Sequence, residues 1–221
     1  LMKLLQHVVR SMDQNVYIYF DENTKEGVVI DPGADPNAIF KIIDENGINL
    51  KAVLLTHGHG DHTGAANAVK NRYNVPIAAH KWEVSVIEDE MISFSQMMGG
   101  SGAVKVDIEL NDNDEYKFNN CTLKVLHTPG HTQGGVCYYD AENSVVFSGD
   151  TLFYASVGRT DFPNPPMKDG MGYPSDENTF RLLNSIRTKL YTLPDNTTVC
   201  PGHGQKSNIG FEKKFNPFVK G

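Results

Sequence analysis

Three histidines and one aspartate lie close together in the segment 56–62, whose sequence is THGHGDH. Imidazole nitrogens and carboxylate oxygens at this spacing are typical ligands of zinc and neighbouring metals. In an extended backbone His57 and His59 point to the same side, so they can share one ion. Asp61 and His62 follow a turn, which places them better for a second ion. The chain has 8 histidines and this segment contains three of them, so we interpret it as a metal-binding loop.

Three more ligand-type residues follow predicted strands, each just beyond a glycine. They are His131 after strand 121–126, Asp150 after strand 144–147 and His203 after strand 197–200. Strand ends that each deliver such a residue can converge on one edge of a sheet. The total of five histidines and two aspartates allows two sets of three ligands, with one carboxylate left to bridge. This inventory indicates a dinuclear site suited to Zn and tolerant of Fe or Mn.

The other polar candidates are weaker. His7 lies within a predicted strand and His80 follows one, so we expect both to be exposed or satisfied by hydrogen bonds. His127 precedes a turn and is interpreted as structural or as a support for a ligand. Asp31 ends a strand and is expected to orient a ligand loop by hydrogen bonding. Arg159, on a long loop, could hold an anionic substrate group or form a surface salt bridge.

The segments between these residues alternate between strand and helix patterns. Short apolar runs predict strands at 4–9, 16–20, 27–30, 52–55, 76–79, 106–110, 115–118, 121–126, 135–139, 144–147 and 197–200. Apolar residues at helical spacing predict helices at 36–45, 63–72, 81–90 and 175–190. Ser175 is expected to cap the last of these helices. No repeat or linker is evident, so we predict one α/β domain over residues 1–221.

Two segments have no clear periodicity. Segment 91–105 combines Phe94 and methionines, Met98 among them, with Gly99 and Gly100. It is either a mobile flap near a substrate or a surface loop whose apolar residues pack inward. Segment 151–173 is a long irregular stretch with several prolines and glycines, and loops of this length are usually functional or mobile.

The composition, with 39% hydrophobic and 21% charged residues, is that of a soluble globular protein. A net charge of −7 without a compensating basic run argues against nucleic acid as a partner. No apolar run approaches the ~20 residues that a transmembrane helix needs, and no export signal is evident. Cys121, Cys137 and Cys200 form no CxxC motif, which favours buried thiols in a reducing compartment. We expect a cytoplasmic protein with a small-molecule substrate and no membrane partner; its oligomeric state stays open.

These residues together resemble the metallo-β-lactamase superfamily, whose HxHxDH loop, later His, Asp and final His occur here in order. The resemblance covers essentially the whole chain. It implies a four-layer αββα sandwich with the metal site at one edge of the two sheets. It also implies two divalent metal ions, with Zn favoured over Fe or Mn. Its ligands for the first ion would be His57, His59 and His131, those for the second ion Asp61, His62 and His203, and the bridge Asp150.

Within the superfamily the chain is similar to the short glyoxalase II-like (hydroxyacylglutathione hydrolase-like) group. The similar stretches are 55–66 (LTHGHGDHTGAA), 148–153 (SGDTLF), 158–163 (GRTDFP), 201–204 and 216–218. Full-length glyoxalase II carries a helical C-terminal domain that helps to bind glutathione, and we expect no such domain here. The basic glutathione contacts of the family are matched only in part, by Arg159 and Lys220, which are the candidate substrate-binding residues.

The resemblance implies hydrolysis of a thioester, an S-acyl derivative of a small thiol, by a hydroxide that bridges the two ions. Asp61 would also steer this hydroxide and is the candidate catalytic side chain. The stretch GRTDF resembles persulfide dioxygenases as well, which share the fold but use one iron. A lactonase or β-lactamase-like hydrolase is a further alternative, as is a non-catalytic binding module.

Overall fold

The computed structural model describes residues 1–10, 12–97, 102–165, 170 and 172–221. Its strands are β1 (Met2–Val9), β2 (Gln14–Asp21), β3 (Glu26–Ile30), β4 (Asn49–Leu54), β5 (Ile77–His80), β6 (Ile108–Leu110), β7 (Glu115–Phe118), β8 (Cys121–His127), β9 (Val136–Asp140), β10 (Val145–Gly149), β11 (Leu152–Phe153), β12 (Ser156–Val157), β13 (Thr198–Pro201) and β14 (Ser207–Asn208). Its α-helices are α1 (Pro36–Glu45), α2 (Gly60–Thr63), α3 (Ala66–Tyr73), α4 (Val84–Ile87), α5 (Asn178–Ser185) and α6 (Ile209–Phe215). Three further helical turns are the 3-10 turns Lys81–Glu83 and Ser175–Glu177 and the π-helical turn Ile186–Leu190.

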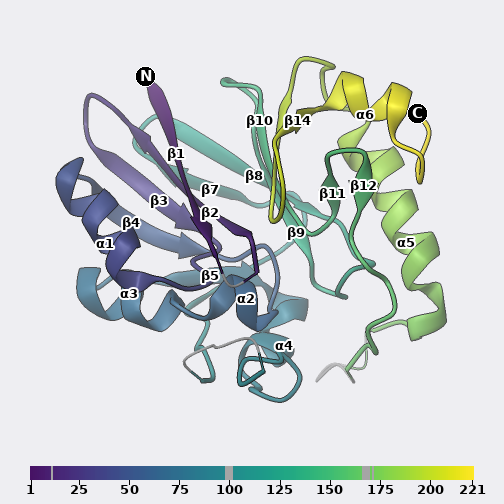
Figure 1. The fold of residues 1–221 in the computed structure, drawn as a ribbon, viewed down its shortest axis with the longest axis horizontal. Helices are drawn as coiled ribbons and strands as arrows, with labels where there is room; N and C mark the ends of the chain where they lie inside the picture. Colours follow the sequence, from purple (N-terminus) through teal and green to yellow (C-terminus); the bar gives the residue numbers. More distant parts are fainter. Residues whose placement is uncertain (11, 98–101, 166–169, 171) are drawn as a thin grey trace.

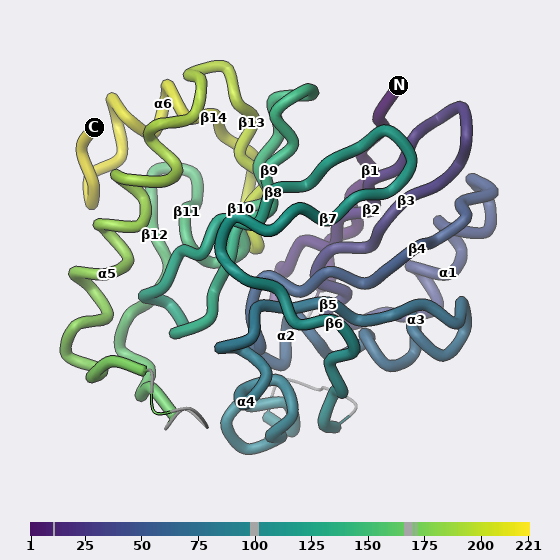
Figure 2. The backbone as a smooth tube through the Cα atoms, turned by 180° about the vertical axis from the view of Figure 1, so that it is seen from behind, coloured from purple at the N-terminus to yellow at the C-terminus, as the bar shows by residue number. Residues whose placement is uncertain are grey.

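Two six-stranded sheets form the centre of the molecule (Figure 1). The first sheet has the order β1-β2-β3-β4-β5-β6, antiparallel up to β3 and parallel from β3 onwards. The second has the order β14-β13-β10-β9-β8-β7, in which β10 and β13 are parallel and the other neighbours antiparallel. Helices α1 and α3 cover the first sheet, and α5 and α6 cover the second, as the view from behind in Figure 2 also shows. The predicted four-layer αββα sandwich is therefore confirmed.

Three clusters of buried apolar side chains fill the spaces between the four layers. Leu54 and Phe147 belong to the cluster between the two sheets. Ile39 and Ile43, one helical turn apart on α1, pack into the cluster that joins the helices to the first sheet. Leu182 of α5 belongs to the cluster on the outer face of the second sheet. The apolar face that each helix turns inward explains why it lies on its sheet.

The ends of several strands meet at one edge of the sandwich, near α2 in Figure 1. Strand β4 leads into the segment 56–62. Strands β10 and β13 are parallel to each other and end at Gly149 and Pro201. Parallel neighbours place their carboxyl ends at the same edge of a sheet, which is where α/β folds place their functional residues. This arrangement positions residues from both sheets around one point.

Two predicted helices differ from those observed. The predicted helix 63–72 is observed as α3, which begins only at Ala66, because Thr63 instead ends the short helix α2 that starts directly after His59. The predicted helix 81–90 ends at Ile87. The side chain of Asp89 accepts hydrogen bonds from the backbone N–H groups of Met91 (2.9 Å) and Ile92 (3.1 Å) and so starts a separate turn.

The prediction that segment 151–173 is wholly irregular is wrong, because β11 and β12 form a short hairpin there. The sequence predicts no strand or helix after the strand 197–200, which is also wrong, since β14 and α6 follow. Two-residue strands are too short to show a period of two. The start of α6 is fixed by Asn208, whose side chain accepts a hydrogen bond from the backbone N–H of Phe211 at 2.8 Å.

Ser175 is not the cap that was predicted. It lies inside a 3-10 turn that precedes α5, and its hydroxyl accepts a hydrogen bond from the backbone N–H of Asn164 at 2.8 Å. The predicted features at Met98, Gly99 and Gly100 lie outside the described residues.

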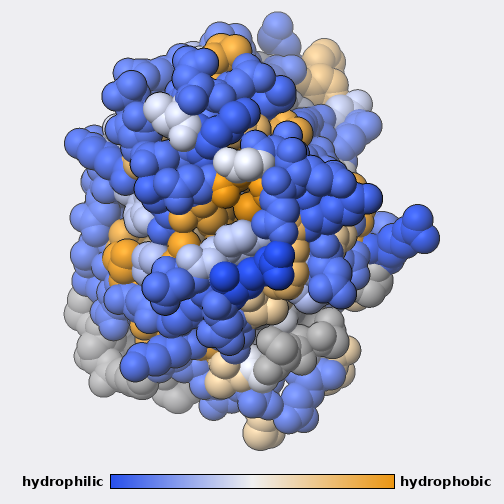
Figure 3. Space-filling model, turned by 90° about the vertical axis from the view of Figure 1, so that its left-hand side faces the viewer, coloured by the Kyte–Doolittle hydropathy of each residue, from blue (hydrophilic) through white to orange (hydrophobic). Residues whose placement is uncertain are grey.

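Hydrophilic side chains cover most of the face shown in Figure 3, where hydrophobic residues gather mainly in a central hollow.

Among the described residues, no helix has the length and apolar character that crossing a membrane requires. Cys121, Cys137 and Cys200 are buried and unpaired, as predicted.

Candidate metal centre

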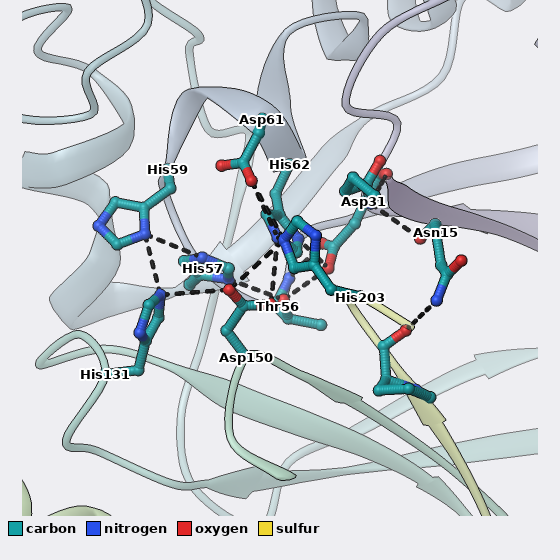
Figure 4. Close-up of polar contacts among 12 residues, drawn as sticks. Asn15, Asp31, Thr56, His57, His59, Asp61, His62, His131, Asp150 and His203 are labelled. Atoms are coloured by element: carbon teal, nitrogen blue, oxygen red, sulfur yellow. Dashed lines mark hydrogen bonds and ion pairs between the residues drawn. The ribbon is translucent and has the colours of Figure 1, made fainter. Parts of the chain in front are cut away.

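Seven histidine and aspartate side chains converge where the strands of both sheets end (Figure 4). Four come from the segment after β4, and one each from the loops after β8, β10 and β13. They are the seven residues predicted as ligands: His57, His59, Asp61, His62, His131, Asp150 and His203. The structure thus brings all seven together, and metal binding by them stays a prediction.

The first ligand group consists of His57, His59 and His131, all buried. The distance from His57 Nε2 to His59 Nδ1 is 3.1 Å, and that from His59 Nδ1 to His131 Nε2 is 3.0 Å. Three ring nitrogens therefore face one another closely enough to bind a single ion.

The second ligand group consists of Asp61, His62 and His203. His203 Nε2 lies 3.2 Å from His62 Nε2 and 3.2 Å from Asp61 Oδ2. The sequence had suggested that Asp61 and His62 serve a different ion from His57 and His59. The geometry agrees with this division, because His203 completes a separate group of three.

Asp150 lies between the two ligand groups, as Figure 4 shows. Its Oδ1 is 3.2 Å from His62 Nε2, and its Oδ2 is 3.5 Å from His131 Nε2 and 3.6 Å from His203 Nε2. One carboxylate therefore reaches members of both groups, which is the position that a bridging ligand would need.

Hydrogen bonds from outside the site fix the orientation of the imidazole rings. His131 Nδ1 donates to the backbone carbonyl of Arg159 at 2.8 Å, and His203 Nδ1 donates to that of Met12 at 3.0 Å. Because a carbonyl oxygen only accepts, the ring proton must lie on Nδ1 in both histidines. Their Nε2 lone pairs then point into the ligand groups, as in known metal sites.

Asp31 supports the ligand loop from behind. Its carboxylate accepts hydrogen bonds from Thr56 N (2.7 Å), Thr56 Oγ1 (2.6 Å) and His62 Nδ1 (2.9 Å). Since the Thr56 hydroxyl donates to Asp31, its oxygen accepts from His57 Nδ1 at 3.1 Å. The predicted orienting role of Asp31 is confirmed, and Thr56 extends it to a second histidine.

Two features show that the site fits a cation. Asp150 Oδ1 is buried, and apart from the approach of His62 Nε2 at 3.2 Å it has no polar partner among the described residues. A Cβ added to Gly202 would lie 2.3 Å from this oxygen and 2.5 Å from His62 Cε1, so glycine keeps the space beside the ligands open. Five imidazoles and two carboxylates form a donor set suited to Zn, Fe or Mn.

The protonation states of the first ligand group favour metal binding, whereas nearby carboxylates outweigh burial and raise the pKa of His62 and His203. Burial, together with neighbouring His131, lowers the pKa of His59 to about 3, and burial also lowers the pKa of His57 and His131. These imidazoles are therefore neutral, which is the form that binds a metal. Burial alone would raise the pKa of Asp150, but nearby His62 outweighs this and holds the pKa well below its usual range.

A cavity of about 300 Å³ lies over both ligand groups. Asp61 and Asp150 line it on the polar side, and Phe153, Val157 and Phe162 form apolar walls. The ring of Phe162 lies 4.7 Å from that of His59, measured between centroids. The cavity therefore combines polar groups that can take part in chemistry with walls that can bury an apolar substrate group.

The two candidate substrate-binding residues differ in position. Arg159 lines the cavity, and its guanidinium donates to the carboxylate of Asp161 at 2.9 and 2.8 Å. Of its two predicted roles, the structure shows the surface salt bridge, and the substrate contact stays a prediction. Lys220 is exposed and is not among the described residues that line this cavity.

The three remaining histidines lie outside both ligand groups, as predicted. His7 pairs with Asp35 at 3.2 Å. His80 stacks on His127 with ring centroids 4.2 Å apart. His127 Nε2 donates to the backbone carbonyl of Gln133 at 2.8 Å, which is a structural role.

Segment 91–105 contributes to the wall of a smaller cavity beside the first ligand group. Ile92 and Phe94 line it, together with His59 and His131. Gly60 N also donates to the backbone carbonyl of Ser93 at 2.7 Å. The described part of this segment therefore packs against the ligand loop, while Met91 and Met97 remain exposed.

Two further residues support the ligand loops and were not predicted from the sequence. The side-chain amide of Asn15 donates to the backbone carbonyls of Pro201 (2.9 Å) and Gly204 (2.8 Å), which holds the loop that carries His203 (Figure 4). Glu83, within the predicted helix 81–90, is fully buried and bonds to two ligand loops. Neither role has a local sequence signal, because the partners are distant in the chain.

Comparisons with known proteins agree with this arrangement. A family model described as the metallo-beta-lactamase superfamily matches residues 11–203. The chain is 36% identical to the hydroxyacylglutathione hydrolase GloC of Haemophilus influenzae, over 96% of this chain and 95% of that protein. It is 33% identical to the probable metallo-hydrolase YqgX of Bacillus subtilis, over 100% of this chain and 99% of that protein.

Solved structures are similar over almost the whole chain. The BLEG-1 B3 metallo-beta-lactamase has a TM-score of 0.86 and 34% identity, covering 99% of this chain and 100% of that one. TTHA1623 in a di-iron-bound form has a TM-score of 0.79 and 31% identity, covering 97% and 100%. ETHE1 from Myxococcus xanthus has a TM-score of 0.76 and 28% identity, covering 97% and 83%.

Proposed function

Since the chain belongs to the metallo-β-lactamase superfamily and is a metal-dependent hydrolase, we propose that it hydrolyses thioesters with two metal ions, as glyoxalase II-like enzymes do. One observation carries this proposal. Two groups of three ligands lie side by side, joined by Asp150, and open into the same cavity.

The chain's residues divide between holding the ions and handling the substrate. The first ligand group would hold one ion, the second group the other, and Asp150 would lie between them. Divalent ions bound there, with Zn favoured, would supply Lewis acidity and an activated water. This chemistry needs no nucleophilic serine or cysteine from the protein.

The residues that line the cavity orient the reactants. The carboxylate of Asp61 lies in the cavity wall, where it can accept a hydrogen bond from a water and direct that water at a carbonyl carbon. Phe153, Val157 and Phe162 surround the acyl group and exclude bulk water. Exclusion of water strengthens the polar interactions that stabilise developing charge on the carbonyl oxygen.

We place the thiol part of the substrate beside Arg159. The guanidinium can bind an anionic group there if it exchanges its contact with Asp161, since both side chains are exposed. The similarity to GloC, whose name includes hydroxyacylglutathione, supports an S-acyl derivative of a small thiol.

Release of free thiol tests this function directly. Purified protein is supplied with a hydroxyacyl thioester of glutathione and with the same acyl group on cysteamine. We expect thiol release that a chelator abolishes and added Zn restores. Fully metallated protein that releases no thiol from either substrate would contradict the proposal.

A second candidate function rests on the stretch GRTDF, which resembles persulfide dioxygenases and whose Arg159 and Phe162 line the cavity. Oxygen consumption with glutathione persulfide by an iron-loaded sample would favour it. The similarity to a B3 metallo-beta-lactamase adds β-lactams to the substrates worth testing.

A further inference from the structure

Glu83 is a fully buried carboxylate that contacts two separate ligand loops. Its Oε1 accepts a hydrogen bond from Gly58 N at 2.8 Å, and its Oε2 accepts one from Gly134 N at 2.9 Å. Gly58 lies between His57 and His59, and Gly134 lies three residues after His131. One side chain therefore connects the two loops that carry the first ligand group.

The segment around Glu83 is packed tightly against both loops. A Cβ added to Gly134 would lie 2.4 Å from Glu83 N and 2.6 Å from Glu83 Oε2. A Cβ added to Gly58 would lie 2.7 Å from Val86 Cγ1. These contacts are too close for a side chain, so glycine lets the loop of Gly134 approach Glu83 and the loop of Gly58 approach Val86 on the same segment.

Burying this carboxylate is unfavourable by itself. Desolvation raises the pKa of Glu83 to about 7, although its two backbone hydrogen bonds oppose the shift. An apolar side chain would fill the same space without the desolvation cost, but it could not accept the two N–H groups. Glutamate is suited to this position because each of its two carboxylate oxygens accepts a backbone N–H from a different loop.

The structure also offers a matched control. Glu212 of α6 is equally buried, and it too accepts a backbone hydrogen bond, from Ala155 N at 3.1 Å. Its side-chain partners are Ser207 and Asn216, which lie outside the ligand loops. A variant of Glu212 therefore measures what loss of a buried carboxylate does away from the first ligand group.

We propose that Glu83 is a positioning residue that fixes the separation between the His57–His59 pair and His131, and thereby sets the metal affinity of the first ligand group. The inference rests on the proposed function only in that this group holds an ion. Glu83 belongs to neither ligand group and is not among the described residues that line the cavity.

The test compares Glu83→Gln with Glu212→Gln and the unchanged protein. In metal-free protein, amide hydrogen exchange is measured at Gly58 and Gly134. The glutamine amide can accept at only one end, so we expect exchange to accelerate about tenfold at one or both glycines in Glu83→Gln. In Glu212→Gln, both glycines should keep their protection.

Metal titration gives the second readout. Loss of an outer support of a metal ligand typically weakens binding about 10–100-fold. In Glu83→Gln we expect the affinity for one of the two ions to fall by this factor and the affinity for the other to stay unchanged. In Glu212→Gln we expect both affinities to stay unchanged. Excess metal should restore kcat in Glu83→Gln.

Glu83→Asp covers the case in which Glu83→Gln does not fold. The shorter side chain keeps the charge but cannot span both glycines, so it should show the same weakened ion. Wild-type affinity for both ions in either Glu83 variant would overturn the inference. If the unchanged protein binds no metal, the proposed function fails. Unaltered amide exchange at Gly58 and Gly134 in a Glu83 variant would separately contradict the role of Glu83 in connecting the two loops.

Discussion

Each of four histidines in the centre uses one ring nitrogen for an outer hydrogen bond and the other for the ligand group. The outer acceptors are a threonine hydroxyl, a carboxylate and two backbone carbonyls. This division orients each ring toward its ligand group before any ion arrives. The residue types and spacing predicted the ligands, whereas the outer acceptors Arg159 O and Met12 O are backbone atoms that no residue pattern reveals.

Asp150 is the residue whose loss should affect both ions at once. We expect Asp150→Ala to lower kcat/KM more than about 100-fold, because loss of an outer support alone costs about 10–100-fold. Asp195→Ala, which removes an exposed carboxylate paired with Lys213, is the control. Near-normal kcat/KM in a fully metallated Asp150→Ala variant would contradict the site assignment.

Glu83 should make the stability of the metal-free protein depend on pH. Its pKa is about 7 in the folded chain, above the ordinary value of 4.5, so between these values the folded chain keeps a proton that the unfolded chain releases. Its contribution to stability is therefore complete below pH 4.5 and is lost as the pH rises through 7.

Urea unfolding of the unchanged protein and of Glu83→Gln in the presence of a chelator measures this effect. From pH 4.5 to 7, the free energy of unfolding of the unchanged protein should fall relative to that of the variant by at most about 3 kcal/mol. A difference that does not vary with pH would show that the carboxyl ionises normally.

Among the elements, the strands that end at the site were the most predictable. Apolar runs followed by a ligand-type residue marked β4, β8, β10 and β13, and after the last three a glycine precedes that residue, because a strand end and a turn have local signals. The β11–β12 hairpin and α6 were missed. Two-residue strands carry no periodic pattern, and α6 packs through Ile209 and Glu212 against partners that are remote in the sequence.

The turn after β13 makes a prediction at this scale. In Gly202→Ala the added Cβ would meet Asp150 Oδ1 and His62 Cε1, so binding of at least one ion should weaken about tenfold or more. Gly47→Ala is the control, since Gly47 follows α1 away from the ligand loops and nothing lies within 4 Å of its added Cβ, although its positive φ of 63° makes alanine strained. Calorimetric metal titration of both variants checks this. Equal affinities in the two variants would mean that the space beside Asp150 is not needed.

In the whole molecule, the centre joins the two halves of the sandwich. The segment after β4 of the first sheet supplies four of the seven side chains, and loops of the second sheet supply His131, Asp150 and His203. The four-layer fold was predictable because the ligand pattern resembles one superfamily. The packing of the four layers against one another depends on the three apolar clusters, which no local sequence pattern specifies.

Bound ions should therefore stabilise the entire fold. An ion at 100 times its dissociation constant adds about 2.7 kcal/mol per site. For a chain of this length, that corresponds to a rise in Tm of about 5–10 °C per ion. Thermal unfolding with and without chelator measures it, and an unchanged Tm would mean that the seven side chains do not bind metal under these conditions.

The most direct test of the dinuclear centre is elemental mass spectrometry of protein purified without chelators or added metals. Two divalent ions per chain, with Zn favoured, is the result that two ligand groups joined by Asp150 predict. One tightly held iron per chain, with no second ion taken up when metal is added, would contradict the dinuclear hydrolase and favour the dioxygenase.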